Sequence, residues 1–146
     1  MQTLVVSAAV LIEDGRVLLS QRKKGTHLSG AWEFPGGKVE PGEDPRSTLV
    51  RELAEELGIE VTAGEILEVT FHRYPERAVL LLFFAAQRTA SSPDPRAIDV
   101  AAFRWASAGE LDPAAFPPAD VAILHKVQAM LSGGPGTSPA GAPKPH

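Results

Sequence analysis

The sequence predicts an α/β fold in which helices cover both faces of a mixed β-sheet. Strand-like runs of apolar and β-branched residues alternate with two segments that have helical periodicity. The run from Ala78 to Ala86 is almost continuously apolar, which is typical of a central strand buried on both faces. A chain of 146 residues with 44% hydrophobic residues is long enough to fold around one such core.

The chain begins with a predicted β-hairpin. Residues Thr3 to Ile12 are mostly small or β-branched and apolar, and a second apolar run extends from Val17 to Ser20. Asp14 and Gly15 lie between the two runs, and an Asp-Gly pair is a strong signal for a tight hairpin turn. A polar, basic loop, residues 21–27, is expected to follow.

A glycine-containing loop then leads into a short acidic helix, which we expect from Pro45 to Leu57. Asp44 can cap its first turn, proline suits the first helical position, and Gly58 can adopt the left-handed conformation that ends a helix. The apolar side chains of this helix fall on one side, which is expected to pack into the protein. They are Leu49, Val50, Leu53 and Leu57.

Three glutamates, Glu52, Glu55 and Glu56, lie on an adjoining strip of this helix, and Glu43 approaches from the preceding loop. Because like charges at this spacing repel, the strip is expected to hold a cation. Oxygen ligands without cysteine favour Mg²⁺, with Mn²⁺ able to replace it, over zinc. Arg51 can hold a carboxylate by a two-point contact. A solvated charged helix face remains the alternative explanation of these glutamates.

The second half of the chain is expected to add three strands and a helix. The strands are predicted from Glu60 to Tyr74, Arg77 to Arg88 and Ala101 to Ala106, and a Ser- and Pro-rich loop covers Thr89 to Ile98. After Asp120, an apolar stripe at helical spacing predicts a final helix: Ile123, Leu124, Val127, Met130 and Leu131. Residues 1–131 then form one domain, and the Gly-, Pro- and Ala-rich residues 132–146 form a disordered tail.

Charge and composition limit the classes of partner. A net charge of −4 and a pI near 5.5 argue against a broad nucleic-acid footprint and against an anionic membrane surface. The chain has no cysteine, no apolar run of membrane-spanning length and no signal-peptide pattern. We therefore expect a cytoplasmic protein, monomer or homodimer, with no stable nucleic-acid or membrane partner.

Residues 37–59 resemble the signature of the Nudix hydrolases at every specified position: Gly37, Glu43, Arg51, Glu52, Leu53, Glu55, Glu56, Gly58 and Ile59. The segments 34–37 and 116–120 are similar to segments of the MutT-type 8-oxo-dGTP diphosphatases, and the Pro-Ala-Asp ending also resembles the related CTP pyrophosphohydrolases. The resemblance implies an α/β/α sandwich around a mixed sheet. It also implies metal-dependent hydrolysis of a nucleoside triphosphate to the monophosphate and pyrophosphate.

The same resemblance implies roles for the acidic residues. Glu55 and Glu56 would be metal ligands together with the Gly36 carbonyl, and Glu52 would be a ligand or the general base. Asp99 matches a late loop carboxylate that binds metal or acts as a base in relatives, although glutamate is usual there and aspartate reaches less far. The expected catalytic group is Arg51, Glu52, Glu55 and Glu56.

Substrate contacts are expected around the glycine loop. Arg22 suits a two-point phosphate contact, His27 either contacts the substrate or only occupies the loop, and Phe34 either lines a base pocket or belongs to the core. Asp120 stands where MutT-type enzymes have asparagine. It either caps the final helix or, when ionised, accepts a hydrogen bond from N7–H of an 8-oxopurine or from the cytosine amine. The expected set is Arg22, His27, Phe34, Gly37, Lys38 and Asp120.

The sequence thus leaves several functions open. The preferred one is a pyrophosphohydrolase that removes oxidised nucleotides such as 8-oxo-dGTP, with CTP, dCTP or a modified pyrimidine nucleotide as the alternative substrate. A non-catalytic nucleotide-binding module is disfavoured by the complete acidic set. A domain that inspects damaged bases within DNA is disfavoured by the acidic pI.

Overall fold

The computed structural model describes residues 2–26 and 29–133, and this part of the chain contains seven strands, two α-helices and three short 3-10 helices. His27 and the tail from residue 134 onward lie outside the described residues. No helix in the described part is long and apolar enough to cross a membrane. In chain order the elements are β1 Gln2–Glu13, β2 Arg16–Gln21, β3 Trp32–Glu33, β4 Gly36–Lys38, α1 Pro45–Leu57, β5 Val61–Arg73, β6 Arg77–Arg88, β7 Ala102–Ala106, η1 Ala108–Glu110, η2 Pro113–Ala115, η3 Pro118–Asp120 and α2 Val121–Leu131.

The strands form a mixed sheet, as predicted. The main path is β3-β2-β1-β6-β5, with β4 paired to β1 and β7 paired to β2. β1 and β6 are parallel from Gln2 opposite Arg77 to Leu11 opposite Ala86, whereas the other pairs are antiparallel. The predicted β1–β2 hairpin is confirmed, and its Asp14 and Gly15 both have positive φ, 52° and 73°, as a type I′ turn requires.

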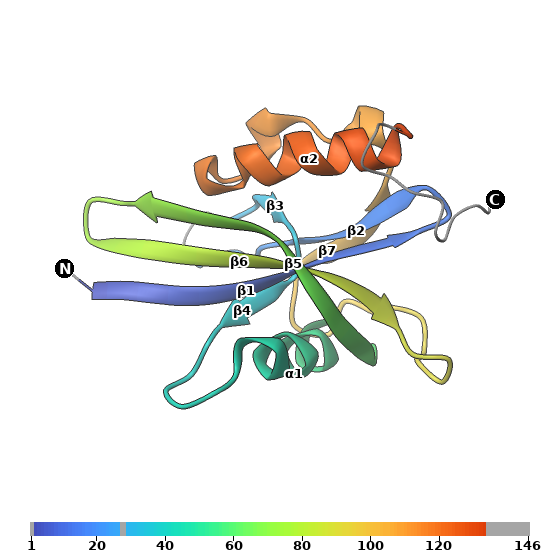
Figure 1. The fold of residues 1–146 in the computed structure, drawn as a ribbon, viewed down its shortest axis with the longest axis horizontal. Coiled ribbons are helices and arrows are strands. Elements are labelled where there is room, and N and C mark those ends of the chain that lie inside the picture. The colour runs from blue at the N-terminus through green and yellow to red at the C-terminus, as the bar shows by residue number, and fades with distance from the viewer. Residues whose placement is uncertain (1, 27–28, 134–146) are drawn as a thin grey trace.

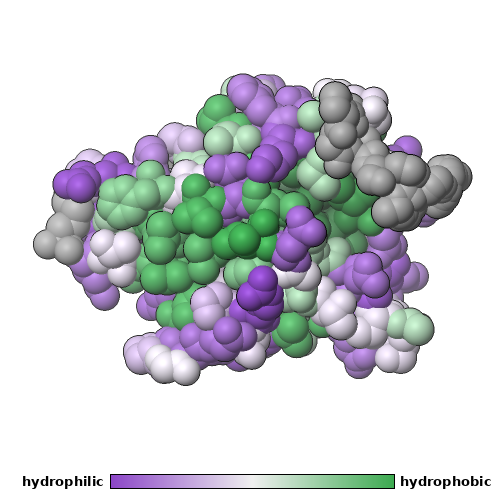
Figure 2. All heavy atoms as spheres, in the orientation of Figure 1, coloured by the Kyte–Doolittle hydropathy of each residue, from purple (hydrophilic) through white to green (hydrophobic). Residues whose placement is uncertain are grey.

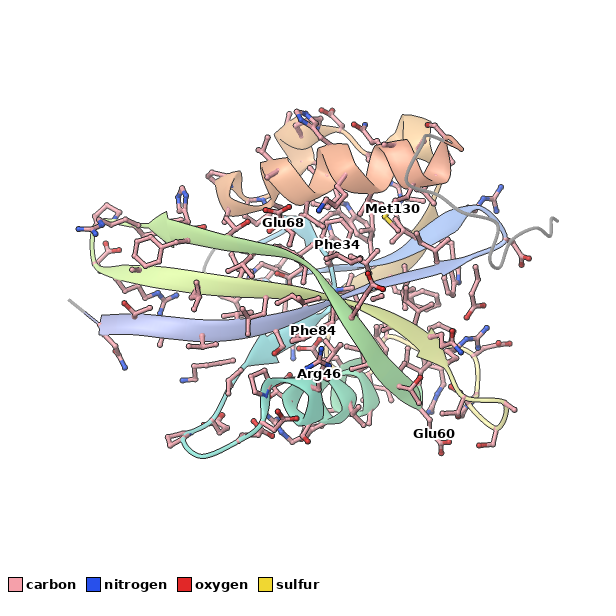
Figure 3. The ribbon with its side chains drawn as sticks, viewed as in Figure 1. Phe34, Arg46, Glu60, Glu68, Phe84 and Met130 are labelled. Atoms are coloured by element: carbon pink, nitrogen blue, oxygen red, sulfur yellow. The ribbon has the colours of Figure 1, made fainter. Side chains whose placement is uncertain are left out.

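The two helices lie on opposite faces of this sheet, which confirms the predicted α/β class (Figure 1). The side chains of β6 explain why helices cover both faces of the sheet, because adjacent side chains of a strand point to opposite faces. Phe83 packs in the core under α2 with Ile123, whereas Phe84 packs in the core over α1 with Leu53. In Figure 3, Phe84 lies on the α1 side beside Arg46, whose guanidinium carbon is 4.8 Å from the ring centre.

Helix α1 has the predicted bounds, but the prediction that Val50 packs into the core is wrong. The Asp44 carboxylate accepts a hydrogen bond from the Ser47 amide, and Gly58 ends the helix with φ 69°. Leu49, Leu53 and Leu57 are fully buried, but Val50 is 39% exposed. Residue 50 is turned 100° from residue 49, which places its side chain at the margin of the buried face.

Helix α2 also follows the predicted stripe, with Ile123, Leu124 and Val127 fully buried. The capping role considered for Asp120 is wrong, because its side chain makes no hydrogen bond to the first turn. Asp120 is instead buried, with 4% of its surface exposed. Capping therefore does not explain why this carboxyl group is buried. The explanation lies in the pocket that Asp120 lines.

Candidate active site

Two glycines bring α1 against the sheet. In the β1–β4 pairing, Gly36 lies opposite Ala8 and Gly37 opposite Ser7. A Cβ atom at Gly36 would overlap the Ser7 carbonyl oxygen, and one at Gly37 would overlap the carboxyl group of Glu52. Only glycine therefore permits this packing, which places the Glu52 carboxyl group directly against the backbone of β4.

Arg51 neutralises one side of the acidic cluster. Its Nε and Nη2 donate to the two carboxylate oxygens of Glu43 at 2.8 and 3.0 Å, the bidentate contact predicted from the sequence. Its Nη1 donates to Glu52 at 3.1 Å and to Glu55 at 3.2 Å. The hydrogen bonds from Arg51, and then from Thr48 and the Glu40 amide, lower the pKa of Glu43 to about 2.

Arg51 does not neutralise the negative charge on the other side of the cluster. Glu56 lies one turn beyond Glu52, and one of its carboxylate oxygens, Oε1, is buried without a hydrogen-bond partner among the described residues. Burial, together with the negative charges of Glu52, Glu33 and Asp99, raises the pKa of Glu56 to about 9. Burial also raises the pKa of Glu52. A divalent cation would supply the missing positive charge, and hard carboxylate and carbonyl oxygens are the ligands that Mg²⁺ prefers.

The predicted metal ligands are only partly gathered. Glu52 and Glu56 contact each other beside Gly36, whereas Arg51 holds Glu55 at the rim with 56% of its side chain exposed. Asp99 lies near Glu56 because its amide donates to the Glu56 carbonyl at 3.1 Å, but its carboxylate pairs with Lys23 at 2.8 Å. Among the described residues, no three acidic or histidine side chains are already clustered as a metal site. The assignment of these acids as metal ligands stays a prediction, and the structure separates an inner pair, Glu52 and Glu56, from two rim carboxylates, Glu55 and Asp99.

A cavity of about 250 Å³ opens beside Glu56. Basic and acidic side chains line it together: Arg22 is paired with Glu33 and Lys23 with Asp99, beside Glu56. This is the charge distribution expected for a polyphosphate that is held by basic side chains and by a cation.

A second pocket, of about 300 Å³, lies between β1, β6 and the start of α2. Its walls include the apolar side chains of Leu4, Val6 and Leu81, and Asp120 contributes a carboxyl group. Burial, with a smaller contribution from the negative charge of Glu33, raises the pKa of Asp120 to about 7. Both forms of this carboxyl group are therefore populated near neutral pH.

Glu33 connects the two regions, and the sequence analysis did not identify it. Its carboxylate accepts from Arg22 at 2.9 Å, and it lines both the phosphate-side cavity and the Asp120 pocket. Burial raises the pKa of Glu33 although the nearby Arg22 opposes that change. An acidic residue inside the aromatic run Trp32-Glu33-Phe34 was the available signal. Tyr74 and Arg77, which also line the Asp120 pocket, had no signal beyond their place at a predicted strand end.

The remaining predicted substrate residues take different positions. Phe34 is 3% exposed and packs in the core, with ring centres 5.9 Å from those of both Phe83 and Phe116 (Figure 3). It also borders a narrow space of about 110 Å³ that Glu56 and Asp120 both line. Lys38 lies exposed at the rim of the Asp120 pocket. Glu56 and the pocket carboxyl group of Asp120 thus line one continuous space.

Comparison with known proteins gives a consistent result. A family model described as "NUDIX domain" matches residues 1–127. A CTP pyrophosphohydrolase of Escherichia coli is 37% identical over 135 residues, which are 92% of this chain and 98% of that protein. An 8-oxo-dGTP diphosphatase of Haemophilus influenzae is 32% identical over 123 residues, 84% of this chain and 89% of that protein. The crystal structure of a MutT Nudix hydrolase from Burkholderia pseudomallei has a TM-score of 0.76 at 28% identity, with 87% of this chain and 99% of that chain covered.

Proposed function

Because this chain belongs to the NUDIX family and is a nucleotide pyrophosphohydrolase, we propose that it hydrolyses a nucleoside triphosphate to the monophosphate and pyrophosphate with Mg²⁺, or Mn²⁺, as cofactor. Its preferred substrate is an oxidised purine nucleotide such as 8-oxo-dGTP, so the enzyme removes such nucleotides from the pool. One observation carries the proposal: Glu56, which contacts Glu52, lines the same space as the pocket carboxyl group of Asp120.

Glu52, Glu56 and the Gly36 carbonyl would hold the cation, with Glu55 and Asp99 available from the rim. When bound, it neutralises phosphate charge and makes a water molecule more acidic. The buried, unpartnered oxygen of Glu56 and the raised pKa of this residue support the assignment, since a cation would occupy that oxygen and favour the ionised form of the carboxyl group. Glu52 is a ligand or the general base, and Arg51 orients it through the 3.1 Å contact to one carboxylate oxygen.

The basic residues of the phosphate-side cavity bind the rest of the polyphosphate. Arg22 is the better suited, because the contact with Glu33 fixes its guanidinium group at the boundary between the two pockets. Lys23 reaches the same cavity from the exposed loop, where it now pairs with Asp99. Gly37 and Lys38 continue the site along β4. The reacting phosphorus is therefore positioned between the acidic pair and these cations.

Asp120 selects the base. A neutral carboxyl group donates one hydrogen bond and accepts another, and 8-oxoguanine presents an acceptor, O6, beside a donor, N7–H. Guanine has acceptors at both positions and matches this group less well. A pKa of about 7 leaves a neutral fraction of the Asp120 carboxyl group near pH 7, and this form suits the oxidised purine.

A second substrate class is favoured by a specific observation. Ionised Asp120 accepts hydrogen bonds only, and the exocyclic amine of cytosine is a donor that suits it. A CTP pyrophosphohydrolase is also among the relatives of this chain. Cytosine nucleotides are therefore the alternative substrate, and pH separates the two cases.

The test is a measurement of kcat/KM for 8-oxo-dGTP, dGTP, CTP, dCTP and 5-methyl-dCTP with Mg²⁺, on both sides of pH 7. We expect 8-oxo-dGTP to be preferred below pH 7 and its advantage to shrink above it, since Asp120 loses its proton near that pH. In the Asp120→Asn variant this pH dependence should disappear. If cytosine nucleotides are preferred at every pH, the alternative substrate is correct, and if no nucleotide releases pyrophosphate, the proposed activity is wrong.

A further inference from the structure

Strand β5 forms one edge of the sheet, and the two halves of this edge are built differently. Among the strands of residues 2–26 and 29–133, only β6 pairs with β5. In the first half, register shifts occur on both sides of Ile66. Arg46 Nε donates to the Gly64 carbonyl at 2.9 Å, and Lys126 Nζ donates to the Leu67 carbonyl at 2.6 Å. Bulges and cationic side chains are the devices by which proteins prevent an exposed edge from pairing with another chain.

The second half of the edge has no register shift, and its cations contact side chains and not the edge carbonyls: Lys126 lies 3.3 Å from the Glu68 carboxylate, and Arg73 lies 5.8 Å from the centre of the Phe71 ring. From Glu68 opposite Phe83 to Arg73 opposite Ala78 the register is regular. The Tyr74 amide donates to the Arg77 carbonyl at 2.8 Å, and the alternation of an antiparallel ladder then turns the backbone groups of Val69, Phe71 and Arg73 away from β6. No side chain of residues 2–26 or 29–133 hydrogen-bonds to these outward groups.

This open edge is also apolar. The side chains of Val69 and Phe71 are 51% and 53% exposed, among the largest exposed fractions of any apolar side chain in the described residues. They lie opposite Leu82 and Leu80 of β6, which are only partly buried. Figure 2 shows hydrophobic side chains gathered across the middle of the face on which β5 lies in front in Figure 1. An unpaired, regular and apolar strand edge is a surface for strand addition.

We propose that a second copy of this chain binds here, by antiparallel pairing of the two 68–72 segments across a twofold axis at Thr70. In this register Val69 lies opposite Phe71 of the second copy, and Phe71 lies opposite its Val69. Thr70 lies opposite Thr70, and Glu68, whose carboxylate also lies 3.3 Å from Lys126 Nζ of its own chain, lies opposite His72. Aromatic with β-branched, threonine with threonine and acid with base are the kinds of cross-strand pair that stabilise antiparallel sheets.

The self-complementarity of these five residues is the reason to assign a second copy and not another protein. A twofold axis perpendicular to the sheet pairs residues of equal parity, and the axis at Thr70 gives every position from 68 to 72 a favourable partner. An axis at Phe71 would instead place Val69 opposite Arg73. The ring of His72 lies 4.5 Å from that of Tyr74, a residue of the Asp120 pocket, so the contact adjoins the substrate site of each copy.

Sedimentation over a range of protein concentrations tests the association. We expect a concentration-dependent monomer–dimer equilibrium in the native chain. The double variant Val69→Lys/Phe71→Lys places lysines opposite each other in both central pairs, so its dimerisation constant should fall by about tenfold or more. The matched control is Thr62→Lys/Ile66→Lys, which adds the same charge to the half of β5 that is already protected. A native chain that stays monomeric, or two variants that associate alike, would overturn the proposal.

Disulfide trapping tests the register. The chain has no cysteine, so a single introduced thiol reports without background. Residues opposite each other at a position without mutual hydrogen bonds, as proposed for Thr70, have Cα atoms about 4.5 Å apart, within the range that a disulfide spans. Mild oxidation of Thr70→Cys should give a covalent dimer. His72→Cys, two residues along the same strand face, should not, and equal yields from the two variants would contradict the proposed axis.

Discussion

The loop–helix segment that carries the acidic residues contains two carboxylates with opposite electrostatic environments. Glu43 accepts two hydrogen bonds from Arg51 and one from Thr48, and its pKa is lowered to about 2. Glu56, on the far side of the same cluster, is buried beside other acids, and its pKa is raised to about 9. The difference separates an acid that stabilises the fold from an acid that is suited to a ligand. Glu43 is paired with Arg51, whereas Arg51 does not reach Glu56.

The cause is the limited reach of one guanidinium group. Arg51 divides its donors among Glu43, Glu52 and Glu55, and none reaches Glu56 one turn further along α1. Glu33 and Asp99, which line the same cavity, are acidic and raise the pKa of Glu56 further. An arrangement of this kind costs stability in the absence of a cation, and such a cost is expected at a functional site.

The largest effect is expected where the charge is unbalanced. We predict that Glu56→Gln lowers kcat by about 10²- to 10⁴-fold, because the amide cannot replace a charged ligand. The fold should persist, since glutamine has the same size and avoids a buried charge. Steady-state kinetics with Mg²⁺ and thermal unfolding of the same sample measure both quantities. If Glu56→Gln kept native activity while Glu43→Gln lost it, the functional assignment of the two sides would have to be exchanged.

The second prediction concerns pH and magnesium together. The folded protein keeps a proton on Glu56 up to about pH 9, whereas the unfolded chain loses it near the ordinary pKa of 4.5. The folded state therefore binds more protons in this interval, and the free energy of unfolding should fall as pH rises, by about 1 kcal/mol per pH unit. Magnesium binds the ionised form and should restore stability, more at pH 8 than at pH 6.

Thermal unfolding at the two pH values, with Mg²⁺ and with EDTA, measures this difference. The Glu56→Gln variant is the control, because it removes the titrating group and should reduce both the pH dependence and the response to magnesium. An equal stabilisation by Mg²⁺ at both pH values, or an unchanged response in the variant, would place the cation elsewhere.

Much of the structure around these two carboxylates could be predicted from the sequence. The bounds of α1 followed from Asp44, Pro45 and Gly58, because caps act locally, and the mixed sheet followed from the apolar run of β6. Val50 was misassigned because it lies at the margin of the apolar stripe, where the packing of the surrounding sheet decides its exposure. The acidic group was identified from its spacing, whereas the division into a balanced and an unbalanced side depends on which carboxylates Arg51 reaches.

Glu33 illustrates what the sequence could not provide. It reaches the site because β3 pairs with β2, which places Glu33 opposite Ser20 and beside Arg22. That pairing joins segments that are separated by a loop, and no local pattern specifies it. Asp120 was identified from the sequence, but its burial and the resulting pKa of about 7 depend on the packing of η3 and α2 against the sheet.

A Glu55 variant tests where the boundary lies between the part of the acidic cluster that Arg51 neutralises and the part around Glu56. Its carboxylate is 56% exposed and contacts Arg51 at 3.2 Å, so a bound cation gains less from it than from the buried Glu56. We predict that Glu55→Gln lowers kcat by about tenfold, a smaller loss than for Glu56→Gln. Parallel kinetics of the two variants over a range of Mg²⁺ concentrations provide the comparison. Equal losses would show that the rim carboxylate is as important as the inner one.

The smallest effect on catalysis is expected at Glu43, whose carboxylate contacts Arg51 and is outside the cavity beside Glu56. We predict that Glu43→Gln changes kcat only a few-fold, through a less fixed Arg51, and lowers the midpoint of thermal unfolding at neutral pH. Because its pKa is lowered to about 2, Glu43 stabilises the fold above the ordinary pKa of 4.5, and this contribution is lost as pH falls toward 2. The difference in unfolding midpoint between the native chain and the variant should therefore shrink in acid, opposite in direction to the effect at Glu56. A difference that stayed constant with pH would mean that Glu43 acts through packing and not through its charge.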